Sequence, residues 1–393
     1  MSAQLRYGPV EAAADLDRLV RFTAESFAVP AEEERRWLDK VGLQNVRVLH
    51  EGSTPVAGLS LLPDFGQYFG GRRIPCAGIA GVASDARSRG RGAGTALMRA
   101  AVQELHGRGI PLAALYPATQ PLYRRAGFEG AGGRWRIRVD PAHLDLADRT
   151  LPLRAIGEEE RPALAELHRQ SLRAGNGGID RSGYLWERVF HPGGQATAGT
   201  GVVGTSGALE GYVIGLQVHA GEGNELRLTD LVATTPQAAT RLLTFLADHR
   251  HQIAQVSWHG AAADPLLALV REQKARVELA AVWMLRIVDV AGALASRGYP
   301  EDLVSELHLE IFDEVVPENR GRFLLEVAGG VGRVRPGGEG RLKLHVRGLA
   351  PLFSGWMAPE AIALSGLLEG DETERRRARS IFAGPAPALR DFF

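Results

Sequence analysis

The residue types and spacing that point most directly to chemistry lie in one Gly- and Arg-rich stretch, Arg89-Gly-Arg-Gly-Ala-Gly94. It follows an apolar run that ends at Ala83 and precedes a segment of helical apolar spacing that begins at Thr95. Glycines let the backbone pass close to a ligand where a Cβ would clash. The first turn of a helix adds unpaired N–H groups and the positive end of the dipole. Together these features predict a site for a phosphate or pyrophosphate group.

Three phosphate motifs compete for this stretch. A dinucleotide fingerprint needs G-x-G-x-x-G in a βαβ unit, and a Walker A loop needs Gly-Lys-Ser/Thr, whereas the glycines here are spaced G-x-G-x-G. The segment Arg89–Gly94 resembles instead the acyl-CoA pyrophosphate loop of the GNAT N-acetyltransferases, R/Q-x-x-G-x-G/A. The frame Arg87–Gly92 also fits, and the remaining alternative is a flexible basic surface turn.

A second segment, Pro121-Leu-Tyr-Arg-Arg-Ala-Gly-Phe-Glu129, resembles the tyrosine-bearing segment of the same superfamily. Its Tyr123 is a candidate acid, because a phenol with a reference pKa of about 10 is protonated at neutral pH and can give its proton to a leaving thiolate. The alternative is a core tyrosine that packs against Phe128. A separate pair, Trp37 and Glu25, either lines an amine pocket or serves ordinary packing and solvation.

The elements that must position these groups read as a mixed sheet with helices on its faces. Apolar periodicity predicts helices over 10–27, 32–41, 95–105 and 120–125, and strands over 46–50, 55–62, 68–74, 79–83, 110–116 and 133–139. We expect the strand over 68–74 to be interrupted by Gly70-Gly71.

The same order of elements returns after Pro152, which predicts a degenerate internal copy. The strand Leu226–Ala233 leads into a helix from Pro236, but only Thr234-Thr235 stands between them, with no Gly/Arg-rich turn. We expect this copy to have kept the fold and lost the phosphate site. A third unit is predicted from Met284, with a strand over 284–288, helices over 290–297, 347–352, 359–364 and 372–381, and alternating strands between them.

This succession of units resembles the Eis (enhanced intracellular survival) family of GNAT acetyltransferases over essentially the full chain. The resemblance implies an α/β and α+β architecture: a catalytic GNAT domain at 1–150, a degenerate GNAT-like mixed-sheet domain at 151–283 and a sterol-carrier-protein-like α+β domain at 284–393. It also implies a homohexamer built as a trimer of dimers, and acetyl-CoA as the acyl donor to a primary amine. By family analogy the amine belongs to an aminoglycoside-like compound, a polyamine or a lysine side chain.

The resemblance also assigns roles to residues. It places acetyl-CoA against Val82, Ala83, Ser84, Gly90, Arg91, Gly92, Ala93, Gly94, Thr95, Ala118 and Thr119. It makes Tyr123 the acid, and the α-carboxylate of Phe393 the base. The loop departs from the family's Arg-Arg-Arg-Gly-like form by a third glycine, which leaves the substrate preference open.

The C-terminal carboxylate needs a physical check as a base. Its reference pKa of about 3.3–3.7 is far below that of an amine, and burial in a dry site would raise it. Chain ends are usually frayed, so the sequence alone favours a disordered end. Only the resemblance favours Phe393 as the base.

Composition bounds the remaining function classes. A chain of 393 residues predicts two or three domains, and 46 basic against 46 acidic residues gives no net charge to attract nucleic acid. The single cysteine, Cys76, excludes an internal disulfide and a cysteine-based metal site, and reads as a buried small residue. We expect no metal, no secretory signal, no membrane span and a cytoplasmic protein. The alternative to an enzyme is a non-catalytic CoA- or lipid-binding scaffold.

Overall fold

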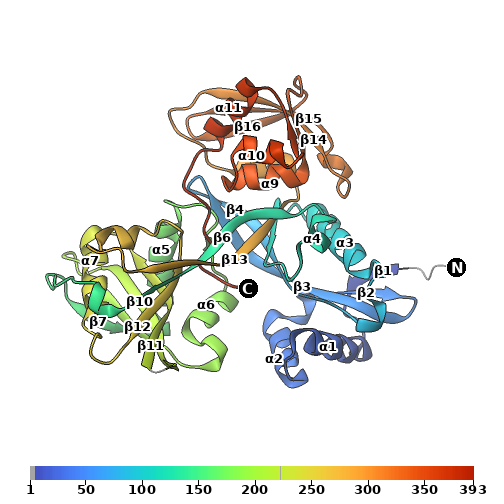
Figure 1. The fold of residues 1–393 in the computed structure, drawn as a ribbon. Helices are drawn as coiled ribbons and strands as arrows, with labels where there is room; N and C mark the ends of the chain where they lie inside the picture. The colour runs from blue at the N-terminus through green and yellow to red at the C-terminus, as the bar shows by residue number, and fades with distance from the viewer. Residues whose placement is uncertain (1–4, 222) are drawn as a thin grey trace.

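The computed structural model describes residues 5–221 and 223–393 and contains two β-sheets (Figure 1). The larger sheet has 13 strands and runs through two halves of the molecule, and the smaller has five strands near the C-terminus. Among the helices of these described ranges, none is long and apolar enough to cross a membrane.

The first half is a sheet with helices on both faces. Its elements are β1 (Leu5–Pro9), α1 (Ala13–Phe27), α2 (Ala31–Val41), β2 (Val46–Glu51), β3 (Thr54–Phe69), β4 (Arg72–Ser84), α3 (Ala93–Gly107), β5 (Leu112–Leu115) and α4 (Gln120–Arg124). Helices α1 and α2 lie on one face, and α3 and α4 on the other (Figure 1). Helix α3 has the predicted apolar stripe, which is fully buried from Leu97 to Leu105.

The predicted strand over 68–74 is wrong. These residues form the tip of a hairpin, in which β3 ends at Phe69 and β4 begins at Arg72. Gly70 and Gly71 have φ values of 59° and 76°, and two successive left-handed residues are what a tight two-residue hairpin turn requires. The glycines therefore reverse the chain between two long strands and do not interrupt a short one.

The second half repeats the order of the first. Its elements are β7 (Leu153–Ile156), α5 (Arg161–Leu172), β8 (Ile179–Asp180), α6 (Gly183–Phe190), β9 (Ala198–Val203), β10 (Leu209–Ala220), β11 (Gly223–Ala233), α7 (Pro236–Ala247) and β12 (Gln255–Gly260). In each half a strand, a crossover helix and a parallel strand follow one another, β4–α3–β5 and β11–α7–β12.

The two halves exchange their last strands. Strand β6 (Glu129–Val139) pairs with β12 of the second half, and β13 (Arg276–Ile287) pairs with β5 of the first, so that the order across the centre is β5-β13-β6-β12. Residues 284–287 thus complete a strand of the large sheet, where the sequence predicted the first strand of the third unit. The exchange fixes the two halves as one continuous sheet (Figure 1).

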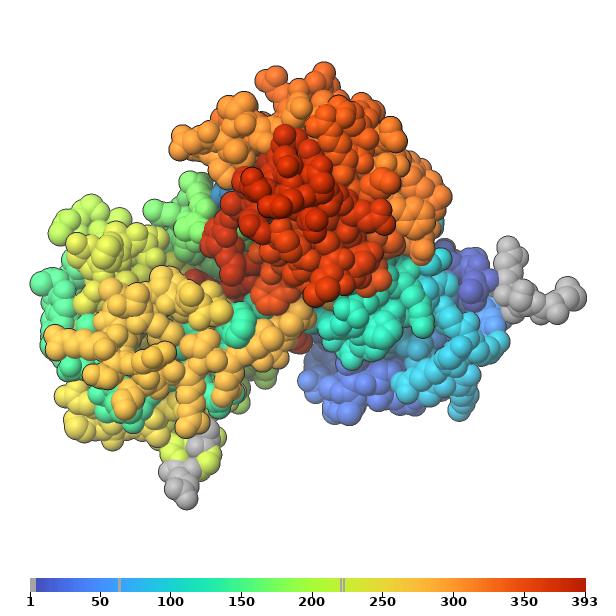
Figure 2. Space-filling view, turned by 45° about the horizontal axis from the view of Figure 1, so that its top comes forward, coloured from blue at the N-terminus to red at the C-terminus, as the bar shows by residue number. Residues whose placement is uncertain are grey.

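The C-terminal unit is an α+β layer over the junction of the two halves. It contains α8 (Val290–Ser296), β14 (Ser305–Phe312), β15 (Gly321–Ala328), β16 (Val331–Pro336), β17 (Leu342–His345), α9 (Val346–Ser354), α10 (Pro359–Leu364), β18 (Leu368–Glu369) and α11 (Glu372–Ile381). The four predicted helices of this unit are confirmed. Figure 2 shows this unit, in orange and red, lying across the first and second halves. Its core is continuous with that of the first half, because one buried cluster joins Phe65 and Phe69 to Phe353 and Phe393.

Candidate active site

The site forms where strands β4 and β5 separate. They pair in parallel only from Cys76 to Gly78, opposite Leu112 to Ala114, although β4 continues to Ser84. The pairing of β4 with β3 also shifts between Ala80 and Ala83, which marks a β-bulge. Beyond Gly78, no strand among the described residues pairs with the side of β4 that faced β5, so the backbone there is open to a ligand.

Position 81 in this bulge requires a glycine for two reasons. Its φ is +61°, in the left-handed region. A Cβ added there would lie 2.7 Å from the ring of Trp37 on α2. The glycine therefore brings the aromatic ring of α2 against the open edge of β4.

The Gly/Arg-rich turn follows β4 directly and leads into α3. Gly90 and Gly92 have φ values of 78° and 85°, and nothing lies within 4 Å of a Cβ added to either, so they serve backbone conformation and leave open space. Gly92 is the N-cap of α3, and the N–H groups of the first helical turn have no intrahelical partner. In the part of the chain that the structure describes, no side chain caps this helix. Arg91 reaches Glu51 at 2.5 Å, and Arg89 the hydroxyl of Ser26 at 3.4 Å. Free N–H groups at the start of a helix are an arrangement that can bind an anion.

Tyr123 lies on the short helix α4, which is the next element after β5. Its side chain is 3% exposed and its ring meets Phe128 edge-on, with centroids 6.4 Å apart. Burial raises the pKa of Tyr123 to about 12, so the phenol keeps its proton throughout the physiological range. The packing alternative and the acid role are thus compatible, because the same contacts that bury the ring hold it in place.

A cavity of about 400 Å³ joins the open edge of β4 to Tyr123 and to the chain end. Four of the residues assigned from the sequence line it: Val82, Ala118, Tyr123 and Phe393. Trp37 lines it as well, whereas Glu25 does not. The other predicted cofactor residues lie outside it, at the end of β4, in the turn, at the start of α3 and just before α4: Ala83, Ser84, Gly90, Arg91, Gly92, Ala93, Gly94, Thr95 and Thr119.

The C-terminal tail is ordered and lies between the two halves of the large sheet. It runs beside β6, where Leu389 donates to the carbonyl of Gly133 at 3.0 Å and Gly133 donates to that of Pro387 at 3.2 Å. Phe393 is 7% exposed, and its ring lies against Phe65 with centroids 5.1 Å apart. The frayed end favoured by the sequence alone is therefore wrong, because these contacts hold the tail in the core.

Sequence reasoning missed the polar wall of the cavity. Glu33 and Glu34 come from α2, and Tyr184 and Arg188 from α6 of the second half. Burial raises the pKa of the Glu34 carboxyl, whose Oε1 has no hydrogen-bond partner among the described residues. The indole of Trp37 donates to the Tyr184 hydroxyl at 2.9 Å, which joins α2 to α6 across the cavity. No local pattern could show this, because the two helices meet only through the fold.

Two other groups of residues stay outside the site. Cys76 is buried, its thiol lies 3.8 Å from the Gln67 amide oxygen, and burial raises its pKa, as expected of a packed small residue. Among the described residues, Glu158, Glu187 and His191 have ligand atoms close enough together for one ion. These three lie at the surface and do not line the cavity.

Family models match three parts of the chain. A GNAT acetyltransferase domain matches residues 10–131, a second GNAT acetyltransferase domain matches 177–287, and a sterol carrier protein domain matches 290–390. The predicted fold class, two tandem GNAT-like units and a sterol-carrier-like unit, is confirmed.

Individual proteins of known sequence or structure match as well. The chain is 27% identical to the N-acetyltransferase Eis of Mycobacterium tuberculosis over 92% of each chain. It is 30% identical to an uncharacterized N-acetyltransferase of Streptomyces avermitilis over 62% of this chain, a match that spans 63% of that protein's length. The crystal structure of a GCN5-related N-acetyltransferase from Anabaena variabilis has a TM-score of 0.94 and 34% identity, with 99% of this chain and all of that chain covered.

Proposed function

Because this chain belongs to the GCN5-related N-acetyltransferases of the Eis type, we propose that it transfers an acetyl group from acetyl-CoA directly to a primary amine. The single observation that carries this proposal is the shared cavity. It brings the open edge of β4, the phenol of Tyr123 and the terminal residue Phe393 to one place.

Acetyl-CoA would bind along β4 and end at the turn. The free edge at Val82 and Ala83, extended by Ser84, can pair with the pantetheine amides as an added strand would. The N–H groups of Ala93, Gly94 and Thr95, together with Arg91 and the glycines at 90 and 92, would hold the pyrophosphate. Ala118 and Thr119 would flank the thioester before α4. This cofactor set is part of the proposal.

The chemistry needs one proton acceptor and one donor. The amine nitrogen attacks the thioester carbonyl carbon, the carboxylate of Phe393 takes the proton of that nitrogen, and the carbon–sulfur bond breaks. Tyr123 gives its proton to the departing sulfur. Burial raises the pKa of Tyr123 to about 12, and the same dry surroundings raise the pKa of the departing thiol, so donor and acceptor are shifted in the same direction.

The cavity wall suits a cationic acceptor. Glu33 offers negative charge at the cavity wall, and Trp37 and Phe392 offer aromatic faces for the body of the amine. An aminoglycoside-like compound, a polyamine and a lysine side chain each carry such a positively charged amine. The homohexameric trimer of dimers, the cytoplasmic location and the domain limit near residue 150 also stay predictions.

The test is thiol release from acetyl-CoA with a panel of amines of these three classes. We expect stoichiometric release of CoA thiol and N-acetylated product with at least one class. Tight binding of acetyl-CoA without release for any amine would instead support the non-catalytic scaffold.

A further inference from the structure

The second half has kept the splayed strands of the first half. Strands β11 and β12 pair in parallel only from Glu225 to Arg227 and then separate, as β4 and β5 do beyond Gly78. Leu231 lies four residues beyond Arg227, as Val82 lies four residues beyond Gly78. The backbone of Leu231 is thus the counterpart of the edge that we propose for acetyl-CoA.

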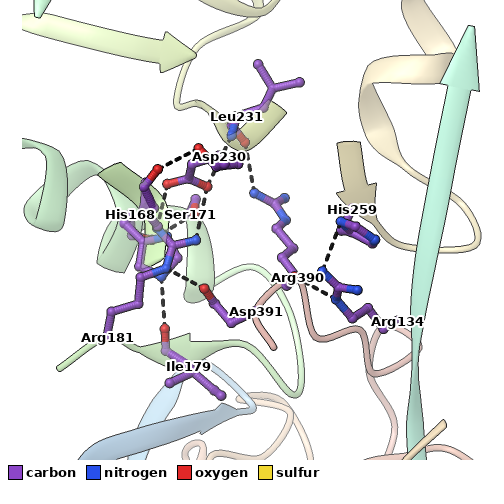
Figure 3. Close-up of polar contacts among 12 residues, drawn as sticks. Arg134, His168, Ser171, Ile179, Arg181, Asp230, Leu231, His259, Arg390 and Asp391 are labelled. Carbon is purple, nitrogen blue, oxygen red and sulfur yellow. Dashed lines mark hydrogen bonds and ion pairs between the residues drawn. The ribbon is translucent and has the colours of Figure 1, made fainter. Parts of the chain in front are cut away.

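In the second half this cleft is occupied by the C-terminal tail. Arg390 donates to the carbonyl of Leu231 at 3.0 Å. Asp391 accepts from Nε of Arg181 at 2.7 Å, and Arg181 also donates to Asp230, beside Leu231, at 3.1 Å. Figure 3 shows the side chains of Arg390 and Asp391 reaching from the tail into this part of the second half.

Arg181 is the centre of this contact. Its side chain is 1% exposed and lies against two carboxylates, those of Asp230 and Asp391. Although burial opposes its charge, Asp230 and Asp391 raise the pKa of Arg181 well above its usual value. Asp230 also accepts from the hydroxyl of Tyr212 at 2.7 Å, so its position is set without the tail. Arg181 and Asp230 thus form a preorganised binding site, and the carboxylate of Asp391 binds to it.

The first half holds the same residue from the other side. The hydroxyl of Tyr116, at the end of β5, donates to the carbonyl of Asp391 at 2.6 Å. The centroid of the Tyr116 ring lies 4.7 Å from that of the Phe392 ring and 5.5 Å from that of the Phe393 ring. The side chain of Asp391 is therefore fixed by the second half and its main chain by the first, two residues before the terminal carboxylate.

We infer that the second GNAT-like unit uses its former cofactor cleft as a clamp for the C-terminus, with Arg181 and Asp391 as positioning residues for the carboxylate of Phe393. This inference rests on the proposed function, because it gives the clamp its purpose. It assigns a role to the unit that carries no phosphate turn. A displacement of the base by about 1 Å costs roughly a hundredfold in rate, so a clamp at this point has a large kinetic effect.

The test compares Asp391→Ala, Asp391→Asn and a chain with one glycine appended after Phe393. The added residue moves the carboxylate by about 3.3–3.6 Å and keeps the ring. We expect kcat to fall roughly a hundredfold in Asp391→Ala, and by less in Asp391→Asn, which keeps an acceptor oxygen for Arg181. KM for acetyl-CoA stays unchanged in both. Asp391→Ala in the glycine-extended chain should cause no further loss, because both changes act through the same carboxylate.

Asp180→Ala is the matched control. Asp180 is also a partly buried carboxylate, but its partners are Arg73 at 2.7 Å and Arg169 at 3.9 Å, and neither of them belongs to the tail or to the pair Arg181 and Asp230. We expect its kcat within twofold of the parent. If Asp391→Ala does not fold, Arg390→Met takes its place. It removes the contact with the Leu231 carbonyl, leaves both carboxylates beside Arg181, and should lower kcat several-fold.

The outcomes separate the two proposals. Parental kcat in Asp391→Ala or, where that chain does not fold, in Arg390→Met overturns the clamp. So does a loss in the glycine-extended double variant that multiplies the two single losses. Parental activity of the glycine-extended chain alone overturns Phe393 as the base, which is the failure of the proposed mechanism and not of tail anchoring.

Discussion

Helices α3 and α7 hold equivalent places in the two halves and begin in opposite ways. At α3 the N-cap is Gly92 in the left-handed region, and no side chain of the described residues caps the helix. At α7 the N-cap is Thr235, whose oxygen accepts from the N–H of Ala238 and whose hydroxyl donates to the Glu210 carboxylate at 2.7 Å. The second turn takes up the N–H of Ala238 with its own side chain and holds a carboxylate at the start of the helix, and that negative charge would repel a phosphate.

The clefts differ in the same way. The first is an open edge that leads to a cavity, and the second is filled by the tail through Arg390 and Asp391. One fold thus supports two tasks, and what decides between them is whether the backbone groups of β4 and β11 are left free or are already paired.

The largest effect is expected from moving the base. With one glycine appended after Phe393, the carboxylate leaves its place while the ring contacts with Phe65 and Tyr116 remain. We expect kcat to fall roughly 10³-fold, within the range for loss of a general base, with the Kd of acetyl-CoA unchanged. Steady-state kinetics and titration calorimetry check this, and a parental rate would show that the terminal carboxylate takes no proton.

The acid should follow with a smaller effect. Tyr123→Phe keeps the buried ring against Phe128 and removes only the hydroxyl, so we expect kcat to fall roughly 10²-fold without a change in acetyl-CoA affinity. Because burial raises the pKa of Tyr123 to about 12, the phenol stays protonated as pH rises, and kcat of the parent should show no alkaline decline below about pH 11. A decline near pH 9 to 10 would contradict the assignment of Tyr123 as the acid.

The contrast between the halves also marks what the sequence could show. The turn around Gly90 and Gly92, the segment at Tyr123 and the capped start of α7 at Thr235 all depend on residues within a few positions of one another, and periodicity and spacing record such contacts. The prediction of a second GNAT-like unit is confirmed for the same reason. The prediction of an interrupted strand at Gly70-Gly71 is wrong because paired glycines fit both a broken strand and a hairpin turn. Only the long pairing of β3 with β4 decides between the two.

Other features depend on contacts far apart in the chain. The place of β13 beside β5 is set by pairing between residues such as Met284 and Leu115, which no local pattern encodes. Glu34 and Arg188 line one cavity from different halves. Asp391 is bound by Arg181, which is itself paired with Asp230, and both lie more than a hundred positions away in the chain. The sequence therefore predicted the separate segments of the candidate site, and only the structure shows how the fold brings them to one cavity.

A change in the turn of the first half should weaken cofactor binding selectively. Gly92→Ala puts a Cβ at φ 85°, a conformation that L residues adopt at a cost of roughly 1–2 kcal/mol, so the turn shifts away from its anion-binding form. We expect KM for acetyl-CoA to rise roughly tenfold, with kcat within threefold of the parent. Gly109→Ala is the control, since Gly109 also has a positive φ of 69° but lies beyond the end of α3. Equal effects of the two variants on KM would argue for strain alone.

The smallest effect is expected at the matching position of the second half. Thr235→Ala removes the cap of α7, which should destabilise that helix end by about 1 kcal/mol, and it leaves the Glu210 carboxylate without the hydroxyl it accepts from. Because the halves share one sheet and global unfolding need not be two-state, the measurement is hydrogen exchange at the amide of Ala238, which should quicken roughly fivefold. KM for acetyl-CoA should not move, and calorimetry should still find one molecule bound per chain. A rise in KM like that of Gly92→Ala would mean that the second turn still takes part in cofactor binding, and the separation of tasks between α3 and α7 would then be wrong.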